Sequence, residues 1–374
     1  MESNFMQVGI SDNSYNPHSI HTQKSKEPVF FENIAYGEGD EYVYVKLKND
    51  WINSYRKNIE YLKDTKDKKD AITLLAFGDV MLDRHVRALM DSNGLNYPFE
   101  KIAKDLDSFM KEYDFIFANL EGPIKEVYVP TLKSIAFRFK PDITQVLKNA
   151  GINIVSIANN HALDQGWGGR EDTMKFLGEA GIMYFGHPKN EIEENHHISE
   201  IRGAKIAFAG FDDTIFKLDF EKTADYINDL SLKNDYVVVS VHWGREYIHT
   251  PTQRKIDMAH MFVDSGADIV IGHHPHVVQT MEIYKGVPIF YSLGNFVFDQ
   301  YFSEATQEGL AIGAIFENEK TTVNLFPYKL PKSQPQLMDD GEKEIFLEKF
   351  ISWGDYSEEF KNNIRKGEIV LTHK

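Results

Sequence analysis

Apolar runs alternate with helical patterns along most of the chain, starting near residue 71. Strands are predicted by AITLLAFGDV, DFIFANLEGP, INIVSIANNH, IMYFG, AKIAFAGF, YVVVSVHWG, ADIVIGHHPH and VPIFYSLGNFVF. Helices are predicted between them by RHVRALMDS, PDITQVLKNAG, EDTMKFLGEAG and TQRKIDMAHMFVDSG. The strand runs are apolar throughout, which favours α/β sheets that are buried on both faces. GLAIGAIFENEKTTVNLFPYKL predicts a closing antiparallel pair.

The first part of the chain has a different pattern. Residues 1–28 are polar and predict a flexible arm. VFFENIAY and DEYVYVKL predict short strands, NDWINSYRKNIEYLKD predicts a helix, and KDTKDKKD predicts a charged linker. We therefore expect an N-terminal extension over residues 1–70, an α/β domain over 71–316, and a C-terminal strand and helix segment over 317–374.

Polar side chains that bind metals or protons follow five of the predicted strands. They are Asp79, Asn119 and Glu121, Asn160 and His161, His242, and His274 with His276. Sites in α/β sheets form at the carboxyl ends of strands, so these side chains are expected to meet at one edge. The set is typical of a hydrolytic site with two metal ions. Because the chain has no cysteine, the predicted cofactors are two divalent ions with oxygen and nitrogen ligands: Mn, Fe or Zn.

The stretch GHHPH carries three histidines within four residues. A single histidine here would usually belong to a turn, but three after a buried strand favour a metal site. On an extended segment His274 and His276 would point the same way, and Pro275 would restrict their conformations. Both are predicted metal ligands. His273 is expected to point the opposite way and to contact ligands or substrate.

The stretch ANNHALDQG supplies an amide, an imidazole and a carboxylate. We predict that Asn160 binds metal through its amide oxygen and that His161 donates a proton during catalysis. Asp164 either orients His161 or caps the following turn.

Three other strand ends complete the predicted ligands, with Asp79, Glu121 and His242. A residue at the position of Asp79 belongs to an ordinary turn as often as it binds a metal. Glu121 is preferred over Asn119, because a carboxylate neutralises metal charge and an amide does not. Either Glu121 or Asp79 could bridge two metals. A lone histidine at the position of His242 is usually a core residue, but its place in the series makes it a predicted ligand.

Arg84 is a third predicted catalytic residue beside His161 and Asp164 and is expected to bind an anionic group. The candidates for substrate contact are Asn119, His273, Arg245, Glu246 and Asn295. Arg245 and Glu246 either pair with each other or touch substrate, and Asn295 either lines the site or shapes its turn. His196, His197, His249 and His260 are assigned to structural roles.

The formal net charge of −16 and a pI near 5.3 argue against nucleic acid as a partner. The sequence shows neither a signal-peptide pattern nor a run of about 18 apolar residues. We therefore expect a cytoplasmic protein, or an extracytoplasmic membrane-associated one if a leader or anchor precedes this sequence.

Six motifs together carry a resemblance to a known family: GDVML, ANLEGP, IANNHALDQG, VHWGREY, GADIVIGHHPHVVQ and YSLGNFVFDQ. From Thr73 to Phe316 the chain resembles the bacterial capsule synthesis protein CapA family, the poly-γ-glutamate capsule group. That family is similar to calcineurin-like metallophosphoesterases. The resemblance implies a four-layer α/β/β/α sandwich with a binuclear metal centre.

The chain departs from the superfamily pattern in two motifs. The Asp-x-His motif reads Asp79-Val80-Met81, and Gly-Asp-x-x-Asp is replaced by Asn119-Leu120-Glu121. The missing histidine implies weaker occupancy of one metal site. Asn159-Asn160-His161 and the pair His274 and His276 match the remaining motifs.

The resemblance implies a metal-dependent hydrolase of poly-γ-glutamate biosynthesis or processing. Its substrate would be anionic, a phosphoester or a γ-glutamyl amide in a small molecule or polyglutamate, and other capsule-synthesis proteins would be partners. The alternatives are a non-catalytic assembly or binding subunit of a polyglutamate synthesis complex, and a tailoring enzyme for a small metabolite.

Overall fold

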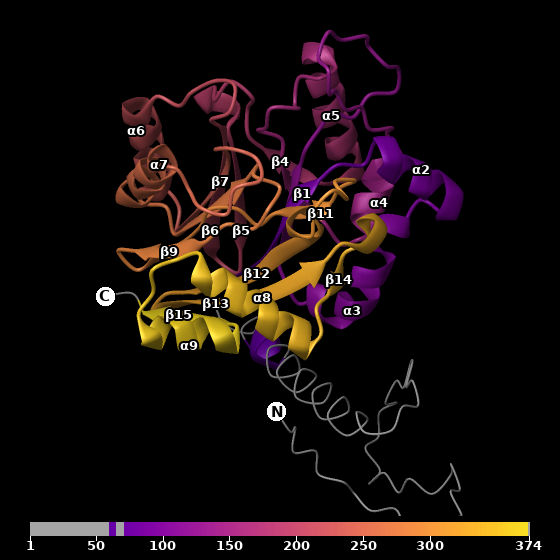
Figure 1. The fold of residues 1–374 in the computed structure, drawn as a ribbon. Coiled ribbons are helices and arrows are strands. Elements are labelled where there is room, and N and C mark those ends of the chain that lie inside the picture. Colours follow the sequence, from indigo (N-terminus) through magenta and orange to yellow (C-terminus); the bar gives the residue numbers. More distant parts are fainter. Residues whose placement is uncertain (1–59, 65–70, 373–374) are drawn as a thin grey trace, which may run out of the picture. The chain divides into compact units, whose positions relative to one another are not determined.

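A computed structural model of the chain describes residues 60–64 and 71–372, which form two β-sheets with helices around them (Figure 1). The arm, strands and most of the helix expected before residue 60 lie outside the described residues. The first sheet runs in the order β14 (Gln336–Leu337), β13 (Lys320–Lys329), β12 (Glu308–Glu317), β1 (Ile72–Val80), β2 (Phe115–Leu120), β3 (Ile154–Ser156) and β4 (Met183–Phe185). In addition, β11 (Asn295–Val297) pairs with β1, and β15 (Glu368–Thr372) pairs with β13.

The second sheet is predominantly parallel in its centre. Its order is β5 (His196–Ile201), β6 (Ala204–Asp212), β7 (Tyr236–His242), β8 (Ile269–His273), β10 (Val287–Phe290) and β9 (Met281–Tyr284). β6, β7, β8 and β10 are parallel neighbours. The continuous apolar runs of these strands are buried on both faces, as expected.

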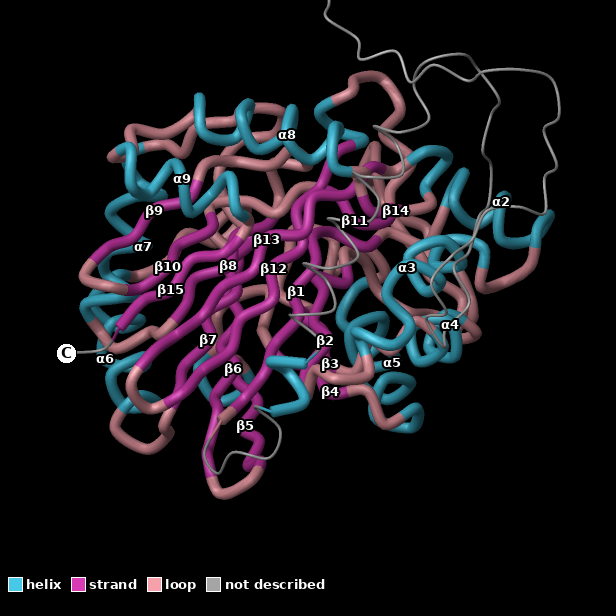
Figure 2. The backbone as a smooth tube through the Cα atoms, turned by 90° about the horizontal axis from the view of Figure 1, so that it is seen from below, coloured by secondary structure: helices cyan, strands magenta, loops and turns pink. Residues whose placement is uncertain are grey.

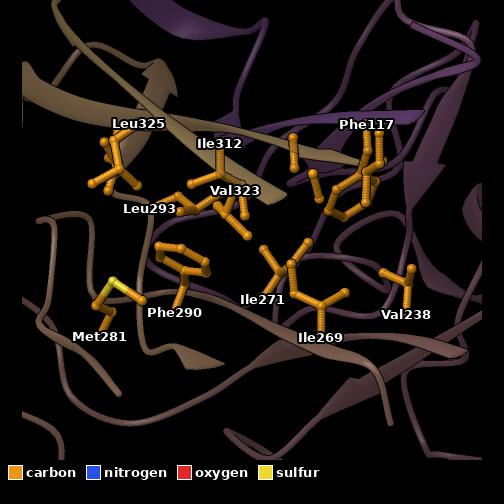
Figure 3. Packing of buried hydrophobic residues seen from close by; sticks show 14 of the residues in the cluster. Phe117, Val238, Ile269, Ile271, Met281, Phe290, Leu293, Ile312, Val323 and Leu325 are labelled. Atoms are coloured by element: carbon orange, nitrogen blue, oxygen red, sulfur yellow. The ribbon is translucent and has the colours of Figure 1, made fainter. Parts of the chain in front are cut away.

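The two sheets pack face to face through the inward side chains of their strands. Phe117 from the first sheet and Val238, Ile269 and Ile271 from the second belong to this shared interior (Figure 3). Each is fully buried. Burying an apolar side chain of this size contributes about 1.5–3 kcal/mol, so this interior is the main source of stability.

Helices cover the outer faces of both sheets. α6 (Phe220–Ser231) and α7 (Gln253–Asp264) pack on the second sheet, where Ile227 and Phe262 meet Phe211 and Val241. α2 (Arg84–Asn93), α3 (Glu100–Met110), α4 (Ile143–Asn149) and α5 (Gly166–Ala180) lie on the side of the first sheet (Figure 1). The expected four-layer α/β/β/α sandwich is therefore confirmed.

The C-terminal segment belongs to the same sandwich. β12 and β13 pair along their whole length, as the sequence predicted for this antiparallel pair. α8 (Asp340–Ser352) and α9 (Glu358–Lys366) bury Phe350 and Ile364 in the same apolar cluster as the sheets, and Figure 2 shows both helices beside β9, β13 and β15. Among the described residues, no helix is long and apolar enough to cross a membrane.

Candidate metal centre

The carboxyl ends of β1, β2, β7 and β8 bring polar side chains to one edge of the sandwich. Asp79 is the β-sheet neighbour of Asn119, and His242 is the neighbour of His273. On β8 the inward positions change from Ile269 and Ile271, in the apolar interior, to His273 at the strand end. The predicted convergence of strand ends therefore occurs.

Asp79 is fully buried at the end of β1. The chain can pass close to β11 here because residue 78 is glycine; a Cβ atom on Gly78 would lie only 1.9 Å from the Gly294 carbonyl oxygen. The Asp79 carboxylate accepts hydrogen bonds from Asn119 Nδ2 at 2.8 Å and His274 N at 3.2 Å. His276 Nδ1 lies 3.5 Å from its Oδ2 atom. Asp79 and His276 are therefore close enough to share a cation.

The electrostatics of Asp79 favour its charged form. Burial acts to raise the pKa of this carboxyl, but the neighbouring His273 and His276 imidazoles hold that pKa well below its usual value. An ionised carboxylate is the form that binds a divalent cation.

Glu121 follows β2 and is also fully buried, yet neither carboxylate oxygen has a hydrogen bond from a described residue. Its Oε1 lies 3.7 Å from His276 Nε2, 3.9 Å from His161 Nε2 and 4.0 Å from His242 Nε2. These separations are too long for hydrogen bonds. Given metal–ligand bonds of about 2.0–2.2 Å, two ligands of one cation lie roughly 3–4 Å apart, which fits this arrangement.

Burial raises the pKa of Glu121 well above its ordinary value; the charge of Asp79 acts in the same direction, and that of His276 opposes it. A buried carboxylate without hydrogen bonds costs stability unless a cation compensates it. Asp79, Glu121 and His276 place their ligand atoms within 4.8 Å of one another, so they form a first possible cation group.

Asn160, His242 and His274 form a second group of donor atoms. His242 Nε2 lies 2.9 Å from Asn160 Oδ1 and 3.1 Å from His274 Nδ1. Burial lowers the pKa of His242 well below its usual value, and burial together with His276 lowers the pKa of His274 to about 3. Both rings are thus neutral, the form in which imidazole binds metals. Glu121 lies between the two groups.

The loop that follows β8 differs from the extended segment expected for GHHPH. His274 and His276 have φ values of 93° and 58°, in the left-handed region. Their imidazoles approach the same site because the loop curls, so the argument from extended alternation was wrong. His276 Nδ1 lies 3.0 Å from Asn295 Oδ1, which means that Asn295 lines the site. Although burial acts to lower it, Glu121 and Asp79 raise the pKa of His276 to about 9.

His273 does not point away from this cluster. Because it continues the inward positions of β8, its Nδ1 lies 3.4 Å from Asp79 Oδ1. The expectation of an opposite direction was therefore wrong, although the expected contact with a predicted ligand is present. Neither ring nitrogen has a hydrogen-bond partner among the described residues.

His161 and Asp164 form a buried pair beside Glu121. The Asp164 carboxylate lies 2.6 Å from His161 Nδ1 and accepts hydrogen bonds from Phe137 N at 2.7 Å and from Lys133 Nζ at 2.5 Å. Asp164 thus fixes the ring orientation and leaves Nε2 facing Glu121. Burial lowers the pKa of His161, against the opposing effect of Asp164.

Lys133 was missed at the sequence level. It lies in an irregular segment between β2 and α4, where no periodic pattern marks it. The backbone bridge between Ile124 and Phe139 closes this segment and returns it to the site edge.

Arg84, Arg245 and Glu246 lie at the rim, whereas the candidates Asn119, His273 and Asn295 are buried. Arg84 is exposed, stacks 4.9 Å from the Phe137 ring centre and forms an ion pair with Asp299. Arg245 and Glu246 are also exposed, and neither a hydrogen bond nor an ion pair joins them within residues 71–372. Glu246 instead lies with His274 and His276 in a second set of potential ligand atoms within 4.8 Å.

The four histidines assigned to structural roles have partners outside the cluster. His196 meets the Tyr226 hydroxyl, His197 the Ser199 hydroxyl, His249 the Val278 carbonyl oxygen, and His260 the Glu282 carboxylate. The position of the superfamily histidine, Met81, is buried, and its sulfur accepts a hydrogen bond from Asp83 N. A thioether is a poor ligand for a hard divalent cation, so Met81 is not a candidate ligand.

Sequence comparison identifies the family. Residues 73–300 match the model of the bacterial capsule synthesis protein PGA_cap. The chain belongs to this family. The capsule biosynthesis protein CapA of Bacillus anthracis is 31% identical over 292 residues, which are 72% of this chain and 70% of the relative. The PGA biosynthesis protein CapA of Bacillus subtilis is 29% identical over 283 residues, 71% of this chain and 73% of the relative.

Solved structures with a similar arrangement are more distant. A hypothetical protein from Thermus thermophilus shares 19% identity with a TM-score of 0.41, covering 72% of this chain and 99% of that chain. Vacuolar protein sorting 29 from Cryptosporidium parvum shares 12% identity with a TM-score of 0.31, covering 72% and 96%.

Proposed function

We propose that this chain is a metal-dependent hydrolase of poly-γ-glutamate synthesis or processing, and that it cleaves a γ-glutamyl amide. The observation that carries the proposal is Glu121, a fully buried carboxylate without hydrogen bonds, with three imidazole nitrogens 3.7–4.0 Å from one of its oxygens. A cation at this position would compensate the buried charge and bring these donors together.

Two divalent cations fit the available donors. Asp79, Glu121 and His276 would hold one ion, and Asn160, His242 and His274 would hold the other, with Glu121 between them. When bound, such ions polarise the scissile carbonyl and make water nucleophilic near neutral pH.

The chain's own contribution to the reaction is proton transfer and orientation. Asp164 accepts the Nδ1 hydrogen of His161 and fixes the ring, so His161 Nε2 can hold the proton that the departing amine receives. Hydrolysis breaks the amide C–N bond, adds one water and yields a carboxylate and an amine. Two ions with two carboxylate ligands leave net positive charge, which favours an anionic substrate despite the negative charge of the whole chain.

The names of the relatives support polyglutamate as the substrate. The two Bacillus proteins are named for capsule and PGA biosynthesis. Arg84, Arg245 and Lys133 place cationic groups near the same edge of the sandwich, where they would meet the carboxylates of a polyglutamate chain.

A second candidate function is an assembly or binding subunit. Large apolar side chains are exposed on segments that follow the strand ends of this edge; they include Tyr128, Leu132, Phe216, Tyr247 and Phe302. Apolar groups gathered around a site are typical of surfaces that bind another macromolecule.

Hydrolysis of a defined γ-linked glutamate oligomer with Mn²⁺ tests the first function. New amine ends are measured for the wild type and for His161→Ala, with p-nitrophenyl phosphate as the phosphoester comparison. We expect amide cleavage by the wild type only. Phosphoester cleavage alone would replace the substrate assignment. Metal binding with neither activity would favour the binding function, and absence of metal binding would overturn the metal centre.

A further inference from the structure

Helix α7 carries a lysine in its first turn that is almost completely buried. Lys255 is 2% exposed, and no carboxylate within residues 71–372 forms an ion pair with it. Burial lowers the pKa of this ammonium well below its usual value. Burying an amine without a carboxylate partner destabilises a fold, because the group loses its hydration. Packing alone does not explain why a lysine occupies this buried position.

Lys255 Nζ contacts residues that follow the carboxyl ends of β7, β8 and β10 in the second sheet. Its Nζ donates hydrogen bonds to Gln279 Oε1 and, at 2.9 Å, to the Tyr291 carbonyl oxygen. It also faces the Trp243 ring at 4.8 Å from the ring centre. Trp243 directly follows the proposed ligand His242, so these contacts connect Lys255 to the chain beside the proposed metal centre.

Gln279 connects Lys255 to the loop after β7 through hydrogen bonds of its own. Its Nε2 donates to the carbonyl oxygens of Ile248 at 2.5 Å and Thr250 at 3.3 Å. The same loop meets the histidine loop directly, because Tyr247 N donates to the Pro275 carbonyl oxygen at 2.8 Å. Hydrogen bonds therefore join the loop of residues 244–250 to that of residues 273–279, and Gln279 joins both loops to Lys255 of α7.

These two loops contain residues with a strained backbone conformation. Tyr247, His274 and His276 all have positive φ values, 63°, 93° and 58°. Positive φ values strain residues other than glycine, and they persist only where the surroundings hold them. The loops also carry Glu246, which lies with His274 and His276 in one potential ligand set.

We propose that Lys255 is a positioning residue of the metal centre. Together with Gln279 it holds residues 244–250 and 273–279 in the strained conformation that directs His274 and His276 toward a cation. The inference rests on the proposed metal centre. It implies that the buried amine lowers the stability of the fold while it raises the affinity for metal.

Lys255→Met separates these two effects, because methionine fills a similar volume without the charge. We expect Mn²⁺ affinity to fall about 10–100-fold, the effect typical of groups that orient ligands, while the apo protein keeps or raises its melting temperature. Gln279→Glu is the second variant. It keeps an acceptor for Lys255 but removes the donor to Ile248 and Thr250, and it should also weaken Mn²⁺ binding.

The measurements are Mn²⁺ affinity by calorimetry, thermal unfolding of the apo proteins, and amide hydrogen exchange in residues 244–250 and 273–279. Lys343→Met, a half-buried lysine of α8 outside the site, is the control and should leave Mn²⁺ affinity and exchange unchanged. Faster exchange in both loops is expected for the Lys255 and Gln279 variants.

A lower melting temperature with unchanged Mn²⁺ affinity and exchange would show that Lys255 only supports the fold. If Lys255→Met does not fold, Gln279→Glu decides by the same criteria. A wild type that binds no Mn²⁺ would overturn the proposed function together with this inference, whereas a binding wild type with unaltered variants would overturn this inference alone.

Discussion

The interior and the edge of the sandwich are built from the same strands but behave oppositely. Ile269 and Ile271 of β8 are fully buried in an apolar interior, and His273 on the same face is buried just as well at the edge. In the interior, burial stabilises the side chains, because they are apolar and have no hydrogen-bonding groups to satisfy. At the edge, Glu121 and His273 are buried without hydrogen bonds from any described residue. The edge therefore lowers the stability of the apo protein, and in the proposed metal centre these side chains would be compensated by cations.

The largest expected effect at the edge concerns proton transfer. His161→Ala should lower turnover about 10²–10⁴-fold, the usual contribution of a general acid, while it keeps metal. Metal analysis and kinetics check this together. Asn160→Ala is the comparison and should lose metal as well. If His161→Ala loses metal as severely as Asn160→Ala, then His161 is a ligand, a role that its 3.9 Å distance from Glu121 also allows.

The next effect separates histidines at the edge from a histidine elsewhere. His274→Ala and His276→Ala should each weaken Mn²⁺ binding more than about 100-fold, beyond the effect of changing an orienting partner. His260→Ala should leave Mn²⁺ affinity unchanged, since that ring meets Glu282 on the helix face. Equal metal content in the three purified variants would remove the ligand assignment.

A smaller effect follows from the charge of His276. Its pKa of about 9 means that, below this pH, an incoming cation must displace a proton from the imidazole. Apparent Mn²⁺ affinity should therefore rise with pH, by up to about tenfold per unit between pH ~6.5 and ~8.5. Calorimetry at constant ionic strength measures it. An affinity that is flat or falls with pH would contradict the placement of His276 among the ligands.

The smallest effect belongs to the interior. Ile271→Val removes one methylene from the packed layer and should lower the free energy of unfolding by about 0.5–1.5 kcal/mol. Because the proposed ligands lie at the strand ends, metal content per folded chain should not change. Chemical denaturation and metal analysis on one preparation check both statements. Loss of metal would show that the edge and the interior are not separable.

The strands and the residues at their ends could be predicted from the sequence, but not the directions of all the side chains in the site. Continuous apolar runs predicted the strands, and polar residues at their ends predicted which side chains meet, because strand direction fixes both. The direction of His273 follows from strand alternation with Ile269 and Ile271. The directions of His274 and His276 could not be predicted, since they depend on a left-handed loop that no periodicity marks.

Contacts made across the fold were equally hidden. Lys133 reaches Asp164 from a segment without a pattern, and Asp299 pairs with Arg84 over a long sequence separation. Such pairings depend on how loops close over the sheet edge, which the spacing of residues along the chain does not specify.

The most direct test of the account is the metal content of protein purified without added metal and then equilibrated with Mn²⁺, measured beside Glu121→Gln. The wild type should hold two equivalents per chain, the second more weakly, with anomalous density at the ends of β1, β2, β7 and β8. Glu121→Gln should lose metal but still fold, because a neutral amide of similar shape replaces the carboxylate that would hold the cation. Less than about half an equivalent in the wild type, far below the occupancy of a two-metal site, would contradict the account.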